Sequence, residues 1–337
     1  MIPQARAVLD EPKPPVGIIE SLTTGFEAVA SHLSLLLLPI ILDLFLWLGP
    51  HLSVNPIAQR SIDFLRSIEF TDPASLQGRQ IWVDILQELG RRTNIFTLLS
   101  TAPLGVPSLM TSQLPILLPG GQPVLWLVDN ELFFLTLALA FSITGLLLGA
   151  IYFSTIGSLL QDGDRPTLIQ TLRRVLINWA RLAAFCVVVG FSMVFISLPV
   201  LVFIGILQII SPALAGLGIS VWGALMLWLF LYLAFSMHGM VLKDRGVFGS
   251  ILDSVRLVQW NIWPVMGLFA VIAVLNWGLG YVWSLPAPDS WLTLAGIGGH
   301  AFVSTGLVAA TFVFYKDRYR WWTEMRQWLV VNAKLKR

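Results

Sequence analysis

Six stretches of this chain are long, apolar and nearly free of charge. A helix needs about 20 consecutive apolar residues to cross the hydrocarbon core of a bilayer. Within that core, only helices and closed barrels satisfy the polar groups of the backbone. The pattern therefore predicts an all-α membrane protein with six transmembrane helices. The predicted spans are 31–50, 131–158, 182–210, 213–241, 264–285 and 291–315.

The composition agrees with a multi-pass membrane protein and argues against several other classes. Hydrophobic residues make up 56% of the 337 positions and charged residues only 12%, whereas a soluble domain carries about a quarter charged residues. The net charge of +2 implies no nucleic-acid partner. The single cysteine, Cys186, can form neither an internal disulfide nor a cysteine-based metal site. Charges and prolines between Asp10 and Pro15 are unlike a signal peptide, so we expect the first span to be uncleaved.

The distribution of basic residues predicts how the spans are oriented. Lys and Arg gather in the connections after the second and fourth spans and in the tail 316–337. Because short basic loops stay in the cytoplasm, we expect both termini there, with a disordered segment over 1–14 and a basic amphipathic tail. The connection 51–130 is also basic, but it is long enough to escape this rule, and we expect it outside.

One short phrase recurs where three of the apolar runs end. Phe-Ser-x-x-Gly-x-x-Leu begins at Phe153 and again at Phe235, and an Asp-Arg pair follows each copy, whereas the third copy keeps only the pair. The arginine can anchor to a lipid phosphate at the membrane boundary while the aspartate caps the next helix. Alternatively, the three pairs form one ring that binds a ligand. The pairs are Asp164 and Arg165, Asp244 and Arg245, and Asp317 and Arg318.

An amphipathic stretch precedes the first, third and fifth spans. The stretch that begins at Gly17 matches the one that begins at Gly246, as far as His32 with Asn261. Apolar residues recur there at helical spacing, as expected of a helix in the membrane interface. We therefore predict three helical hairpin repeats, each preceded by a cytoplasmic amphipathic helix. Such a helix is either an elbow that orients the next span or a docking site for a cytoplasmic partner. The first helix and span occupy 15–50, and spans two to six occupy 131–315.

The extracytoplasmic insertion 51–130 predicts two amphipathic helices and an irregular segment. Asn55 and Asp72 are each followed by proline, which is typical of an N-cap and the first helical position. Five prolines between 103 and 123 exclude a continuous helix there. That segment is either a lid over the outer mouth of the bundle or packing material. The expected helices are 56–69 and 74–92.

Polar residues inside spans are the first place to search for chemistry. Asp43, Asn276 and His300 each lie roughly 6–10 residues from the outer end of a span, which places them about 9–15 Å deep. We hypothesise that they meet in a polar pocket that binds a cation or relays a proton. Alternatively, Asp43 snorkels outward and the other two hydrogen-bond locally. His238 and His300 differ in depth by about 16 Å, so we expect no haem, no metal and no other cofactor.

The run from Lys243 to Phe248, continued by Ser250, Val255 and Asn261 to Trp263, resembles a known group of sequences. It is similar to bacterial multi-pass proteins grouped near the glycerophosphoryl diester phosphodiesterase membrane domain. The resemblance covers about 135–320 and implies a helical layout in a bacterial cytoplasmic (inner) membrane. In that family a separate soluble domain carries the phosphodiesterase, and this chain has no such domain. The resemblance therefore implies neither hydrolysis nor any catalytic residue.

The search for enzyme motifs sets the expected function. The sequence holds no phosphate-binding loop, no His-Glu-x-x-His and no Gly-x-Ser-x-Gly. We therefore expect a non-enzymatic scaffold or accessory subunit of a membrane complex, with membrane lipids and other membrane subunits as partners. The alternative is a transporter or lipid-handling protein that uses the polar pocket, and an enzyme is the third choice.

Overall fold

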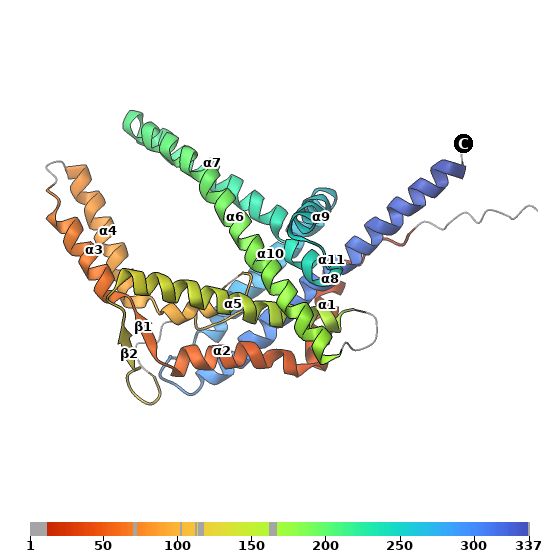
Figure 1. The fold of residues 1–337 in the computed structure, drawn as a ribbon, viewed down its shortest axis with the longest axis horizontal. Coiled ribbons are helices and arrows are strands. Elements are labelled where there is room, and N and C mark those ends of the chain that lie inside the picture. The colour runs from red at the N-terminus through yellow and green to blue at the C-terminus, as the bar shows by residue number, and fades with distance from the viewer. Residues whose placement is uncertain are drawn as a thin grey trace, which may run out of the picture.

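The computed structural model describes residues 12–69, 73–101, 103–111, 113, 118–161 and 167–335. Nearly all regular structure in these residues is helical (Figure 1). Two short strands, β1 (His51–Ser53) and β2 (Leu125–Leu127), and two 3-10 helices, Leu33–Leu36 and Ile95–Leu99, complete it. The α-helices are α1 (Ile18–Ser31), α2 (Leu37–Leu48), α3 (Asn55–Ser67), α4 (Pro73–Arg92), α5 (Glu131–Leu159), α6 (Leu168–Ile210), α7 (Pro212–Leu233), α8 (Ser236–Lys243), α9 (Val247–Trp260), α10 (Ile262–Trp283) and α11 (Thr293–Leu335).

The long apolar helices confirm the predicted class of an all-α, membrane-like protein. Among the described residues, five helical segments are long and apolar enough to cross a bilayer: α5, α6, α7 with α8, α10, and α11. A sixth candidate is a broken pair. Helix α1 meets the helical segment Leu33–Leu48 at an angle of 91°, so α1 turns away from the direction of α2.

Two helices are longer than the sequence pattern predicted. The stretch before the third span is continuous with that span in the 43-residue helix α6, and the tail as far as Leu335 continues α11. A capping box of Thr167 and Gln170 starts α6, and the helix ends only at Ser211, before Pro212. Pro199 lies inside α6 without ending it. The separate amphipathic helix predicted before the third span is therefore wrong, because nothing in the chain stops the helix between the two parts.

Helices α1 and α9 have the same length, and similar residues and backbone conformations stand at their two ends. Each has 14 residues and follows a glycine of similar conformation, with φ −70° and ψ 169° at Gly17 and φ −68° and ψ 166° at Gly246. Each ends at a non-helical polar residue, His32 or Asn261. Each also buries a serine on its first turn and a valine near its end.

Helix α11 lies at the centre of the molecule. In its most apolar 18-residue window 56% of the residues are buried, compared with 6% for α6. Helix α1 packs closely against it: a Cβ atom at Gly25 would lie 2.5 Å from the backbone nitrogen of Ala310. The largest buried side chains of the core include Phe312 of α11 itself, and Trp47 of α2 and Phe153 of α5 belong to the same cluster.

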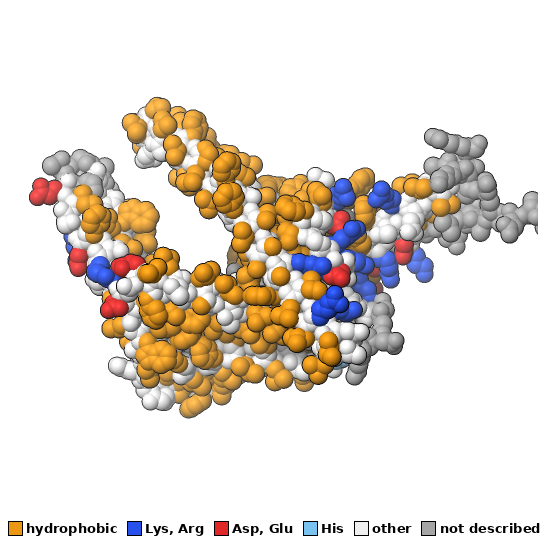
Figure 2. Space-filling view, in the orientation of Figure 1, with side chains coloured by type: hydrophobic (Ala, Val, Ile, Leu, Met, Phe, Trp, Pro, Cys, Tyr) orange, Lys and Arg blue, Asp and Glu red, His pale blue; other side chains and the backbone are white. Residues whose placement is uncertain are grey.

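The two ends of the molecule differ in charge. Lys and Arg gather at one end, while apolar side chains cover most of the remaining visible surface (Figure 2). We call the first the basic end; it holds the start of α6, the end of α8 and residues 316–320 of α11. The insertion end holds α3, α4, β1 and β2. The hairpin of α6 and α7 and the hairpin of α3 and α4 both project from the body (Figure 1).

The insertion contains helices α3 and α4 where helices 56–69 and 74–92 were expected. Asn55 is not the N-cap of α3: that residue is Val54, and the buried side-chain oxygen of Asn55 has no hydrogen-bond partner among the described residues. Asp72 lies outside the described residues. The strands were not predicted. They pair in parallel, with Leu52 opposite Trp126, and they join the beginning of the insertion to its end.

Candidate functional site

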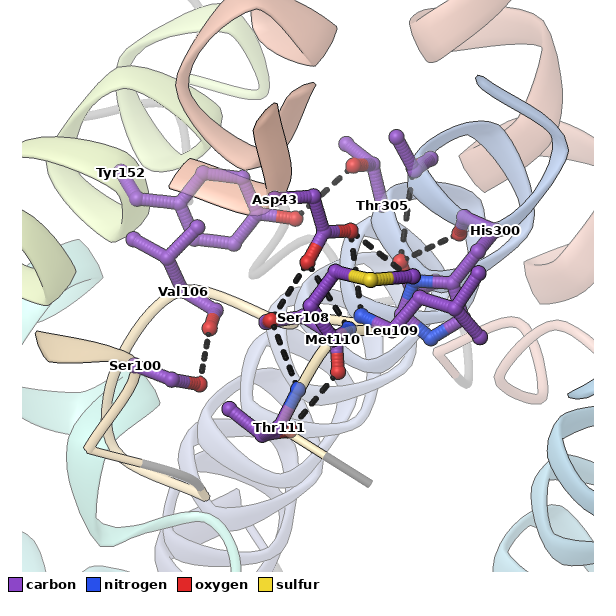
Figure 3. Close-up of polar contacts among 12 residues, drawn as sticks. Asp43, Ser100, Val106, Ser108, Leu109, Met110, Thr111, Tyr152, His300 and Thr305 are labelled. Carbon is purple, nitrogen blue, oxygen red and sulfur yellow. Dashed lines mark hydrogen bonds and ion pairs between the residues drawn. The ribbon is translucent and has the colours of Figure 1, made fainter. Parts of the chain in front are cut away.

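Asp43, the carboxylate predicted to line a polar pocket, is fully buried on α2. Its oxygens accept three hydrogen bonds from the insertion: from Ser108 Oγ at 2.5 Å, Leu109 N at 3.0 Å and Met110 N at 3.1 Å (Figure 3). A carboxylate that accepts backbone N–H groups in this way caps a turn of the chain. Asp43 therefore fixes residues 108–110 to the bundle.

The structure brings His300 to Asp43 but not Asn276. Nδ1 of His300, on α11, lies 4.0 Å from Asp43 Oδ2. Asn276 is exposed on α10 and does not join them, so the prediction that it shares a pocket with Asp43 and His300 is wrong. Helix α10 is apolar on all sides, and its sequence could not tell which side is buried. Hydrogen-bond donors of residues 108–110 already occupy the Asp43 carboxylate. The arrangement therefore suits a structural role, in which Asp43 attaches the insertion to the helical bundle.

At the basic end, the third Asp-Arg pair joins three segments. Asp317 Oδ2 accepts a hydrogen bond from Val16 N at 2.7 Å. Arg318 is buried and donates to Asn261 Oδ1 at 3.0 Å and to Val16 O at 3.4 Å. The predicted role of Arg318 as a lipid anchor is therefore wrong. The reason is that its guanidinium is used inside the protein, where it holds the start of α1 against the break between α9 and α10.

The second Asp-Arg pair, Asp244 and Arg245, contacts α6, α9 and α11. Asp244 adopts the left-handed conformation, with φ 54°, and forms a salt bridge with Arg181 of α6. It does not cap α9, whose N-cap is Gly246 without a side-chain hydrogen bond. Arg245 lies 3.3 Å from Asp253 and donates to the Tyr319 hydroxyl at 3.2 Å. The capping role predicted for Asp244 is thus wrong, because its carboxylate points to α6. The first pair, Asp164 and Arg165, lies outside the described residues.

A pocket of about 370 Å³ lies at the basic end, where the end of α5, the start of α6 and the end of α8 meet. Three of its residues, Ser154, Leu242 and Asp244, belong to the recurring phrase. No pattern in the sequence indicates that the two copies share a cavity, because α8 lies about 60 positions or more beyond the other two segments in the chain. The lining residues are Ser154, Ser158, Gln161, Thr171, Arg174, Asn178, Val241, Leu242, Lys243 and Asp244.

Hydrogen bonds fix the polar wall of this pocket. Asn178, buried on α6, donates to Ser154 Oγ at 3.0 Å across the crossing of α5 and α6. The serine oxygen accepts that bond, so its own O–H remains to donate. Gln161 donates to the carbonyl of Leu242 at 3.1 Å, which ties α5 to α8. The wall is therefore held in place and presents a hydroxyl donor.

The charges of the pocket favour an anion. Among its described lining residues the one carboxylate, on Asp244, is neutralised by Arg181. Arg174 and Lys243 make no ion pair with any carboxylate in the described part of the chain. Lys243 Nζ lies 5.1 Å from the centre of the Tyr319 ring. A guanidinium, an ammonium and a hydroxyl around one cavity match the donors that bind phosphate and carboxylate groups.

Exposed apolar residues form a stripe along α6, next to the face of that helix that lines the pocket. Leu168, Leu172 and Leu176 are exposed by 86%, 58% and 47% and repeat every four residues. On a helix this spacing forms one stripe, adjacent to the face that carries Thr171, Arg174 and Asn178. The site therefore combines a cationic cavity with an apolar border.

Comparison of the chain with family models, with curated proteins and with solved structures gave no match in any of the three. The function must therefore be argued from the geometry of the site.

Proposed function

We propose that this integral membrane protein binds an anionic, phosphate-bearing membrane lipid, with the head group in the pocket between α5, α6 and α8. The observation that carries the proposal is a pair of cations, Arg174 and Lys243, that have no carboxylate partner among the described residues. The carboxylate of Asp244, which lines the same cavity, is already neutralised by Arg181. A phosphate group between Arg174 and Lys243 would supply the missing counter-charge.

The apolar border favours an amphiphile. The stripe of Leu168, Leu172 and Leu176 would lie in the acyl-chain boundary while the polar face of α6 meets the head group. Anionic lipids attract basic segments at the cytoplasmic leaflet. With the termini in the cytoplasm, as we propose, the basic end faces that leaflet.

The arrangement supports our proposal of three helical hairpin repeats in a ring. The start of α6 packs on α5, α9 packs on α7 and α8, and α1 packs on α11. Each leading segment thus contacts the hairpin before it, and α1 contacts the last one. The matching boundaries of α1 and α9 agree with this scheme. Six spans, an inner-membrane location and the resemblance to the phosphodiesterase membrane domain remain proposals about layout.

A scaffold or accessory subunit is the second proposal, and one observation favours it. The hairpin of α6 and α7 projects from the body (Figure 1) and buries only 6% of the most apolar window of each helix. Such a surface can accept transmembrane helices of another subunit. Purification in a mild detergent tests this role, and a particle that is always monomeric and free of partners would count against it. We propose no enzymatic activity for either role.

Lipid binding to the purified protein tests the leading proposal. Native mass spectrometry would compare an anionic phospholipid with a zwitterionic one of the same chains. We expect Arg174→Gln to weaken binding of the anionic lipid about tenfold. Arg173→Gln removes the same charge from the neighbouring residue, which does not line the pocket, and should bind like the wild type. Equal losses in both variants would contradict a specific site.

A further inference from the structure

We infer that α4 is an interfacial helix whose apolar stripe enters the lipid leaflet at the insertion end. The partner is the boundary between head groups and acyl chains. The inference concerns the end of the molecule opposite the head-group pocket and does not depend on that pocket.

The stripe consists of apolar side chains that the protein leaves uncovered. Ile81, Trp82, Ile85 and Leu89 are exposed by 52%, 60%, 48% and 52%. Positions 81, 85 and 89 repeat every four residues and form one face, with Trp82 at its edge. A surface of this kind is costly in water.

A different face of α4 packs against α3. Val83 is only 2% exposed. A Cβ atom at Gly90 would lie 2.7 Å from Ala58 Cβ of α3, so the helices touch there. The hairpin therefore buries one face of α4, and the stripe remains available for another partner.

Polar residues of both charge signs lie beside the stripe on α4. Gln80 donates to Asp84 at 2.8 Å, and Glu88 forms a salt bridge with Arg92. A helix with a strip of apolar residues, a tryptophan and an opposing polar face is typical of the membrane interface. Charges of both signs lie on α4 and Glu88 is paired with Arg92, so apolar area more than net charge would drive the contact of this helix with lipid.

The position of the hairpin selects lipid as the partner. A salt bridge of 3.2 Å joins Arg60 of α3 to Glu131, the first residue of α5. There the apolar surface of a spanning helix begins, with Leu132 exposed by 74%. The exposed strand β2 (Leu125–Leu127) adjoins it in sequence.

The views of the whole molecule agree. An open notch separates the hairpin of α3 and α4 from the hairpin of α6 and α7, and α4 lies on the side of its hairpin that faces this notch (Figure 1). The space-filling view shows apolar side chains along both sides of this notch (Figure 2). Lipid that fills the notch would be covered by α4 at the insertion end.

Spin labels on the full chain in lipid nanodiscs test the inference. The single native cysteine is first removed by Cys186→Ser. Ile85→Cys then places a nitroxide on the stripe, and Asp84→Cys places one on the adjacent polar face. Oxygen concentrates in acyl chains and a nickel chelate in water, so collision rates with the two reagents report the surroundings of each label.

The expected result is opposite accessibility at neighbouring positions. The label at position 85 should collide several-fold more with oxygen than with the nickel chelate, and the label at 84 should show the reverse. Raising the salt concentration should change neither value. Equal access of the chelate to both positions would overturn the inference, because the stripe would then face water. Exclusion of both reagents at 85 would also overturn it, because protein, such as a second copy of the chain, would then cover the stripe.

Discussion

The two ends of this protein each hold a group of polar side chains, buried at the insertion end and exposed at the basic end. At the insertion end, the Asp43 carboxylate accepts three hydrogen bonds from residues 108–110 and has His300 beside it. At the basic end, the cations Arg174 and Lys243 line a cavity without a carboxylate partner among the described residues. A polar group satisfied by its own chain stabilises the fold. We propose that the cations at the basic end, which have no carboxylate partner among the described residues, bind an anionic ligand.

The largest effect is expected from breaking the insertion end. Asp43→Ala leaves the N–H groups of Leu109 and Met110 without their acceptor, and each buried unsatisfied donor costs roughly 1–3 kcal/mol. We expect a loss of about 3 kcal/mol or more in the free energy of unfolding, measured by denaturation in detergent. Limited proteolysis should then cut between 103 and 111. Asp43→Asn keeps one acceptor oxygen and should lose less of the free energy of unfolding. If Asp43→Ala were as stable as the wild type, Asp43 would not attach the insertion to the bundle.

Arg318 sharpens the comparison, because it lies at the basic end yet is satisfied inside the protein. Arg318→Met keeps the apolar stem and removes the bonds to Asn261 and Val16. We expect a loss of about 2 kcal/mol in the free energy of unfolding, measured by thermal denaturation. Anionic lipid should still bind to the folded fraction. A variant of normal stability that no longer binds lipid would show that Arg318 is a boundary anchor after all.

The contact between α1 and α11 tests the proposed ring. Gly25→Ala would place a methyl group 2.5 Å from the backbone nitrogen of Ala310, and overpacking of this kind costs roughly 1–3 kcal/mol. Gly278→Ala in α10 is the matched control, because nothing lies within 4 Å of the new atom. Thermal denaturation should separate the two variants. Equal stability would mean that α1 does not pack against α11 as described.

The smallest expected effect is a dependence of stability on pH through His51. Burial lowers the pKa of this histidine below its usual 6.5, although a backbone hydrogen bond with Leu46 opposes the shift. The folded protein therefore favours neutral His51. Its contribution to stability is complete above pH 6.5 and declines as the pH falls below that value. Thermal denaturation at pH 7.5 and pH 5.5 should show a difference that His51→Gln reduces, and an unchanged difference would exclude His51 as its source.

Local patterns in the sequence predicted local features of the fold. Long apolar runs identify spanning helices because the bilayer imposes length and composition. The glycines before α1 and α9 and the breaks at His32 and Asn261 were also visible as matched letters. The continuity of α6 differs from the prediction because an amphipathic pattern does not by itself end a helix, and no glycine or proline separates residues 168–181 from the span that follows.

Features that depend on distant contacts could not be predicted. The partners of Asp43 lie some 65 positions further along the chain, and no periodicity links them. Because α10 is apolar on all sides, its sequence does not indicate whether Asn276 faces the protein interior or the surface. The pocket joins three separate segments, so its charge balance appears only when Arg181 meets Asp244. The sequence predicts a binding site beneath the insertion, at Asp43, whereas the structure gives better support for a binding site at the basic end, in the pocket of Arg174 and Lys243.

An electron microscopy map of the protein in nanodiscs that contain an anionic phospholipid would test the central claim most directly. We predict ordered density for a phosphate group between Arg174 and Lys243, within reach of the Ser154 hydroxyl, and a continuation of that density along Leu172 and Leu176. No ligand density should appear between Asp43 and His300. Lipid or ion density at Asp43, together with a pocket at the basic end that holds only solvent, would contradict the account.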